Sequence, residues 1–121
     1  MRILVCGGRE FDDWGLMCST LDEILFSESR PLTIIEGGAK GADFLGRVWA
    51  KFRSCPYKEY PADWKTHGRA AGPIRNKQML EEGKPDLVVA FAGGSGTRDM
   101  IRQAEKAGVK VVEVSWRNQT E

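Results

Sequence analysis

Glycine-rich segments carry the main chemical signal in this sequence. Four of them stand out, and three directly follow an apolar run typical of a buried strand. They are Gly7-Gly8-Arg9, Gly37-Gly38-Ala39-Lys40-Gly41-Ala42-Asp43, Ala71-Gly72-Pro73 with Arg75-Asn76, and Gly93-Gly94-Ser95-Gly96-Thr97. Glycine at the carboxyl end of a strand lets the backbone turn sharply and approach a ligand closely. Several such loops at one edge of a parallel sheet would form an anion-binding crevice.

The segment 93–97 gives the clearest indication of an anion site. Three of its first four residues are glycine, which exceeds what a tight turn requires. Its backbone N–H groups and the start of the following helix are predicted to bind a phosphate or carboxylate, and Thr97 can add its hydroxyl. The alternative is an ordinary strand-to-helix turn in which Thr97 caps the helix.

The segment 37–43 predicts a second binding turn. It lacks the Gly-Lys-Ser/Thr sequence of a Walker A loop, and it does not complete GxGxxG. Gly37, Gly38 and Gly41 are predicted to approach the ligand. We expect Asp43, early in the next helix, to accept hydrogen bonds either from ligand hydroxyls or from amides of the neighbouring loop. The simpler interpretation is an acid that stabilises the positive end of the helix dipole.

Charged, amide and aromatic side chains near these loops complete the predicted site. Arg9 can clamp a phosphate with two hydrogen bonds, or it forms a surface ion pair. Arg75 and Asn76, in the first turn of a predicted helix, can reach phosphate or ribose. Trp64, together with Asp63 beside it, can stack on a nucleobase, or it covers the hydrophobic core.

Composition limits the classes of function. The 121 residues match a common single-domain size, so we expect one domain, 1–121. A net charge of +1 disfavours a dedicated nucleic-acid binder. Three widely spaced cysteines and one histidine predict no disulfide framework and no metal site, and they favour a reduced, cytoplasmic setting. No apolar run approaches the ~20 residues that span a bilayer, so we expect no membrane partner. The sequence predicts no cofactor.

Apolar periodicity predicts five strands that alternate with four helices. The strands are expected at 3–6, 32–35, 57–60, 86–91 and 109–114. The first helix is expected to begin at Asp12 or Asp13 and the last at Thr97. The core-facing positions of the first two helices are expected at Trp14, Met17, Leu21, Ile24, Leu25, Ala42, Leu45, Trp49 and Phe52. The third helix is expected at 73–82, after a connection (61–72) without apolar periodicity.

This alternation indicates an α/β protein. The predicted fold is a Rossmann-like, doubly wound, parallel five-stranded sheet with strand order 3-2-1-4-5 and helices on both faces. The chain reverses direction between the first and fourth strands, where ligands bind in such sheets. Gly7-Gly8-Arg9 and the segment 93–97 are therefore expected side by side.

The chain resembles the SLOG superfamily of Rossmann-like domains, and within it the small stand-alone family of YspA type. The residues that carry the resemblance run from 7 to 97. They are Gly7-Gly8-Arg9-Glu10-Phe11, Glu36 to Asp43, Pro61-Ala62-Asp63-Trp64, Ala71 to Asn76 with Met79, and Gly93 to Thr97. The resemblance implies a nucleotide-like ligand across the two central glycine loops. It also implies a homodimer or larger homo-oligomer, with the four tryptophans as modest support.

Three functions remain open at this point. The first is a binding protein for a nucleoside phosphate or an ADP-ribose-like ligand. The second is a nucleoside 5′-monophosphate phosphoribohydrolase, as in the superfamily members that activate cytokinins, with Asp43, Arg75 and Asp99 as candidate catalytic residues. The third is single-stranded DNA binding, by analogy to DNA-processing protein A, although the charge disfavours it.

The last glycine loop departs from the phosphoribohydrolase pattern, which reads Pro-Gly-Gly-x-Gly-Thr-x-x-Glu with a catalytic glutamate. Ala92 stands at the proline and Met100 at the glutamate. Asp99 lies one residue earlier, which turns it by about 100° around a helix. The sequence therefore favours binding over hydrolysis.

Overall fold

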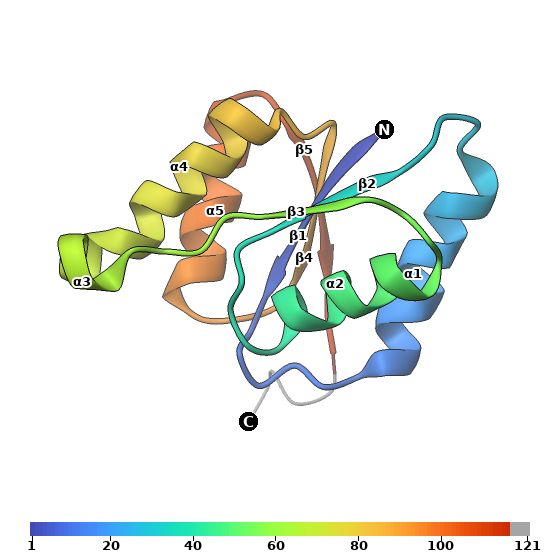
Figure 1. Cartoon of the computed structure of the whole chain (residues 1–121), viewed down its shortest axis with the longest axis horizontal. Coiled ribbons are helices and arrows are strands. Elements are labelled where there is room, and N and C mark those ends of the chain that lie inside the picture. Colours follow the sequence, from blue (N-terminus) through green and yellow to red (C-terminus); the bar gives the residue numbers. More distant parts are fainter. Residues whose placement is uncertain (117–121) are drawn as a thin grey trace.

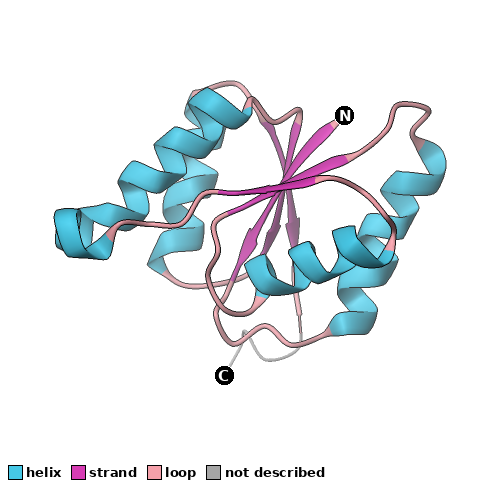
Figure 2. Ribbon diagram, viewed as in Figure 1, coloured by secondary structure: helices cyan, strands magenta, loops and turns pink. Residues whose placement is uncertain are grey.

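The computed structural model describes residues 1–116, which form a parallel sheet between two layers of helices (Figures 1 and 2). The strands are β1 (Arg2–Gly7), β2 (Thr33–Glu36), β3 (Tyr57–Glu59), β4 (Leu87–Phe91) and β5 (Lys110–Val114). The helices are α1 (Trp14–Ser27), α2 (Ala42–Phe52), α3 (Trp64–His67), α4 (Ala71–Gly83) and α5 (Ser95–Lys106). The strand order is β3-β2-β1-β4-β5 and every pairing is parallel, which confirms the predicted fold.

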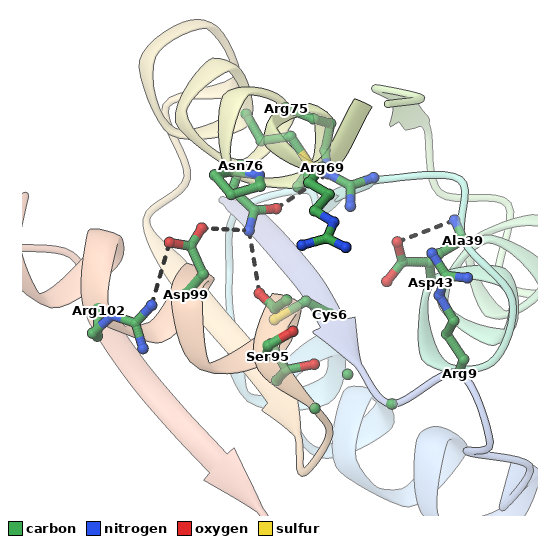
Figure 3. Close-up of a pocket in the computed structure, with 18 of the residues that line it drawn as sticks. Cys6, Arg9, Ala39, Asp43, Arg69, Arg75, Asn76, Ser95, Asp99 and Arg102 are labelled. Carbon is green, nitrogen blue, oxygen red and sulfur yellow. Dashed lines mark hydrogen bonds and ion pairs between the residues drawn. The ribbon is translucent and has the colours of Figure 1, made fainter. Parts of the chain in front are cut away.

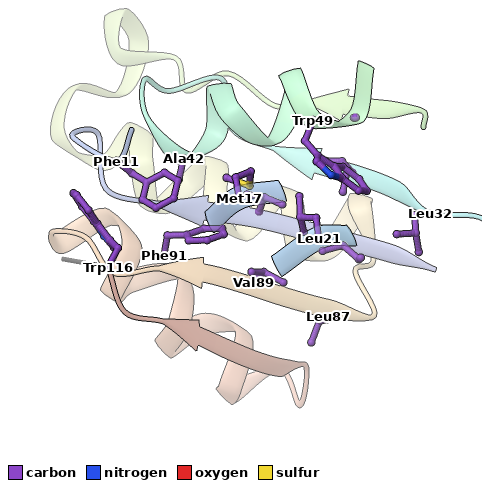
Figure 4. Close-up of a cluster of buried hydrophobic side chains, with 14 residues drawn as sticks. Phe11, Met17, Leu21, Leu32, Ala42, Trp49, Leu87, Val89, Phe91 and Trp116 are labelled. Carbon is purple, nitrogen blue, oxygen red and sulfur yellow. The ribbon is translucent and has the colours of Figure 1, made fainter. Parts of the chain in front are cut away.

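Alternation along the central strands divides the core into two clusters. Ile3 and Val5 of β1 point to the layer formed by α1 and α2, where Trp49 is fully buried (Figure 4). Leu4 and Cys6 point to the opposite layer, formed by α4 and α5. Every residue of β4 is buried, because this strand pairs on both edges and is covered on both faces. Strand β3 is short and exposed at the sheet edge, as predicted.

Two of the predicted core positions are wrong. Trp14 is 36% exposed and Phe52 is 62% exposed, although the other members of their stripes are buried or packed against the core. Trp14 is the first residue of α1 and Phe52 is the last residue of α2, so both stand at the ends of their stripes. Their rings contact each other edge to face with centroids 6.0 Å apart.

The connection after β3 is more structured than the sequence predicts. Asp63 caps α3, because its Oδ1 accepts a hydrogen bond from the Thr66 N–H at 3.1 Å. A 3₁₀ turn (Gly68–Ala70) follows, and α4 begins at Ala71 rather than Pro73. Elements this short contain too few apolar positions to produce a periodic pattern. This segment carries Trp64 to the carboxyl edge of the sheet. Among the helices of residues 1–116, none is long and apolar enough to cross a membrane.

Candidate functional site

A cavity of about 700 Å³ opens at the carboxyl edge of the sheet, where β1 and β4 lead to different helix layers (Figure 3). Its size lies within the range of small-molecule sites. The predicted site residues that line it are Gly7, Gly8, Arg9, Asp43, Trp64, Arg75, Asn76, Gly94, Ser95, Gly96, Thr97 and Asp99. The structure therefore brings residues of all four glycine segments and most of the predicted side chains to one cavity.

The first turn of α5 presents open backbone donors to this cavity. Gly94 is the N-cap, no side chain caps the helix, and no acidic residue lies in its first turn. The first helical hydrogen bond runs from the Arg98 N–H to the Gly94 carbonyl, so the N–H groups of Ser95, Gly96 and Thr97 precede the helical ladder. The prediction that Thr97 caps α5 is wrong, because Thr97 is a buried residue inside the first turn. These donors and the positive end of the helix dipole favour an anion.

The loop that leads into α2 is closed by the protein's own carboxylates. The Asp43 Oδ2 atom accepts hydrogen bonds from the Gly37 N–H at 3.1 Å and the Ala39 N–H at 3.2 Å. The Gly38 N–H donates to Glu36 Oε1 at 2.6 Å. Of the two predicted partners for Asp43, the loop amides are therefore present in the structure. These amides are no longer available to a phosphate.

Asp43 nevertheless keeps one oxygen for the cavity. The residue is only 5% exposed, and its Oδ1 accepts no hydrogen bond from residues 1–116. Figure 3 shows the carboxylate bonded to Ala39 on one side and facing the open cavity on the other. Burial raises the pKa of Asp43 to about 6, against the opposing effects of the two amide hydrogen bonds and the charges of Arg75 and Arg9.

Glu36 is a second buried acid behind the same loop. Its side chain is fully buried, and its Oε2 has no hydrogen-bond partner within the described residues. The nearest cation is Arg47, whose Nε lies 4.0 Å from that oxygen. Burial raises the pKa of Glu36 to about 7, and the charges of Asp43 and Glu59 act in the same direction.

Arg75 connects the two sides of the cavity. Its Nη1 donates to the Gly37 carbonyl at 2.6 Å, and its Nε donates to Asn76 Oδ1 at 3.1 Å. The buried Asn76 amide donates in turn to Asp99 Oδ2 at 3.0 Å and to the Gly96 carbonyl at 3.2 Å. Asp99 is therefore held by Asn76, and also by Gln103 at 2.8 Å.

Trp64 and Arg9 form the outer wall. The Arg9 guanidinium lies 5.9 Å from the centroid of the Trp64 ring, and it makes no ion pair within residues 1–116. Trp64 is 49% exposed, so it does not cover the core. An exposed aromatic ring beside an unpaired guanidinium provides a flat surface next to a charge.

Five residues that were predicted to bind the ligand do not line the cavity. They are four glycines, Gly37, Gly38, Gly41 and Gly93, and one acid, Asp63. The four glycines serve close packing instead, because an added Cβ would meet neighbouring atoms at each. At Gly93, for example, that Cβ would lie 2.6 Å from the Gly8 nitrogen. Asp63 is the cap of α3.

Seven further residues line the cavity, and none of them was predicted to bind the ligand. Ala39, Gly72 and Pro73 belong to the glycine segments, and Met79 belongs to the resemblance to the SLOG superfamily. Cys6, Arg69 and Arg102 were not indicated at all. Arg102 stands three residues after Asp99, a spacing that puts both on one face of α5, and this was the available signal. Arg69 lies in the short 3₁₀ turn, where no pattern points to it. No group of three or more potential metal ligands occurs in residues 1–116.

Comparison with known proteins identifies the family. The model of the YspA, cpYpsA-related SLOG family matches residues 1–67. The chain belongs to this family. The "Gene 61 protein" of Mycobacterium phage D29 is 35% identical over 119 residues, a match that covers 92% of this chain and 94% of that protein. The SLOG family model reaches from β1 to α3, so it includes Arg9, Asp43 and Trp64.

A solved structure with a similar fold is UDP-GlcNAc 2-epimerase from Methanocaldococcus jannaschii. The TM-score is 0.55 at 17% identity, over 94% of this chain. The SLOG-family chain corresponds to only 31% of the epimerase chain. At this identity the similarity concerns the Rossmann-like fold alone.

Proposed function

We propose that the chain binds a nucleotide-derived small molecule, such as a nucleoside phosphate or an ADP-ribose-like ligand. The phosphate lies at the first turn of α5, and the base lies against Trp64. The single observation that carries this proposal is the cavity of about 700 Å³ with open amides at one wall and an exposed tryptophan at another. The SLOG family and the Rossmann-like neighbour are consistent with a nucleotide-related role.

Two features favour binding over hydrolysis of the nucleotide. Met100, at the position of the hydrolase glutamate, is fully buried and has no acid or base function. Asp99 has both oxygens engaged, one by Asn76 and Gln103 and the other by Arg102 at 3.5 Å. Asp43 is then the remaining carboxylate at the cavity.

The substitution Gly94→Asp tests this function. A Cβ at Gly94 meets no atom within 4 Å, so the fold tolerates the change while the carboxylate opposes an anion at the helix terminus. Isothermal titration calorimetry with AMP and ADP-ribose should show binding to the wild type and a loss of about 100-fold or more in the variant.

Two control variants separate charge from position. Gly94→Ala adds volume without charge, and Gly15→Asp adds the same charge in α1, away from the cavity. Both should bind like the wild type. Equal binding by Gly94→Asp and wild type would refute the α5 site, and release of free base from AMP at about 1 per second would instead establish the hydrolase.

A further inference from the structure

The geometry points to Asp43 as the residue that selects the ligand's sugar: it favours a free hydroxyl facing α2 and rejects a phosphate at the same position. This inference rests on the proposed function, because it assumes a phosphate at α5 and asks what the opposite wall accepts. It names the ligand class as nucleotides that are phosphorylated at one end of the sugar only.

The position of Asp43 is fixed from behind. Its Oδ2 is held by two backbone N–H groups, those of Gly37 and Ala39, so the carboxylate cannot rotate without losing both hydrogen bonds. Asp43 is only 5% exposed, and its Oδ1 faces the cavity (Figure 3). An acceptor that opens on the cavity and has no hydrogen-bond partner within residues 1–116 gains one when a ligand donates to it.

One of the two cations whose charges act on Asp43 is already engaged by the protein. Arg75 donates from its Nη1 to the Gly37 carbonyl and from its Nε to Asn76 Oδ1, whereas Arg9 lies over the Trp64 ring. The loop amides that could have bound a phosphate are closed by Asp43 itself and by Glu36. The α2 wall therefore presents an acceptor, whereas the α5 wall presents donors.

This difference between the walls gives the cavity a polarity. A ligand satisfies both walls when it carries an anion at one end and a hydrogen-bond donor at the other, as a nucleoside 5′-phosphate with free sugar hydroxyls does. A second phosphate on the sugar would bring another anion against a buried carboxylate, and like charges in a buried site repel strongly.

A series of ligands tests the inference on the wild-type protein. Calorimetry at pH 8 compares AMP with its 2′-deoxy and 3′-deoxy analogues and with adenosine 2′,5′-bisphosphate and adenosine 3′,5′-bisphosphate. We expect at least one deoxy analogue and the matching bisphosphate to bind about 10-fold to 100-fold more weakly than AMP.

The variant Asp43→Asn sharpens the test. The asparagine oxygen can still accept from the Gly37 and Ala39 N–H groups, while its amide turns a donor toward the cavity. The weakened bisphosphate should then bind within about 3-fold of AMP, because the repulsion is gone. Gly94→Asp serves as the contrast, since it should weaken every ligand of the series by a similar factor.

The outcomes are distinguishable. Strong AMP binding with no difference among the analogues refutes the role of Asp43 and leaves the proposed function intact. Binding by none of the five nucleotides refutes the role of Asp43, and the titration with ADP-ribose then decides the proposed function. If Asp43→Asn does not fold, the wild-type series alone decides, because it requires no substitution.

Discussion

Two glycine-rich loops lie at the carboxyl edge of the sheet, and they differ in what their amides contact. The loop before α2 is filled by Asp43 and Glu36, which accept from three consecutive N–H groups. The loop before α5 has no acidic residue in the first turn of its helix and no capping side chain. Similar glycine content therefore produces a closed structural turn in one case and an open anion site in the other.

The comparison shows that an acid near the start of a helix decides whether a glycine loop is available to a phosphate. Asp43 stands in the first turn of α2 and reaches back to the loop, whereas the nearest acid in α5, Asp99, lies beyond the first turn and is bonded to Asn76. The same carboxylate that closes the first loop gives it an acceptor function toward the cavity.

The largest expected difference between the loops concerns their tolerance of alanine. Gly41 has a φ of +78°, and a Cβ there would meet the Gly8 carbonyl and the backbone of Arg9. Gly96 in the open loop has no atom within 4 Å of such a Cβ. We expect Gly41→Ala to lower the free energy of unfolding by about 3 kcal/mol or more, and Gly96→Ala to change it by about 0.5 kcal/mol or less. Urea denaturation measures both, and similar values for the two variants would contradict the distinction.

The closed loop should also make the fold more stable in mild acid. Glu36 has a pKa raised to about 7 by burial, above its ordinary 4.5, so the folded chain binds a proton that the unfolded chain lacks. The free energy of unfolding should therefore rise as the pH falls from 8 toward 5, by on the order of 3 kcal/mol for this group. Glu36→Gln should remove this share of the rise and leave the share of Asp43, whose pKa is also raised. An unchanged pH slope in the variant would show that Glu36 ionises normally.

The open cavity gives the smallest of the expected effects, at Trp64. If the ring stacks on a base, Trp64→Ala should weaken AMP binding by about 1–3 kcal/mol, and Trp64→Phe by less. The stability of both variants should stay close to that of the wild type, since Trp64 is 49% exposed. Calorimetry and tryptophan fluorescence measure the binding. Equal affinity of Trp64→Ala and the wild type for AMP would show that the base does not lie against Trp64.

Much of the fold followed from the sequence, because buried strands and glycine turns leave strong local patterns. The apolar run of β4 and the Asp13 cap, which accepts from the Leu16 N–H at 2.9 Å, are examples. The core position predicted for Trp14 was wrong, because helical periodicity identifies the buried face of a helix but not where along the helix that burial ends.

The sequence predicted where the site lies, but not which of its loop amides remain free to bind a ligand. Glycine spacing located the loops before α2 and α5 at one edge, and the side chains of Arg75 and Asn76 were expected there. Which amides stay open depends on the reach of Asp43 and Glu36 in three dimensions, and spacing does not encode it. Arg69 was missed for another reason, since a single 3₁₀ turn has no period.

The hydrogen bonds of Arg75 have a consequence for the motions of the molecule. This side chain belongs to α4, in one helix layer, yet it holds the Gly37 carbonyl at the entrance to α2, in the other layer. Its neighbour Asn76 holds α5 through Gly96 and Asp99. A fluctuation that lifts the N-terminal half of α4 must therefore break bonds to both layers, so we expect the three segments around the cavity to open and close as one cooperative unit.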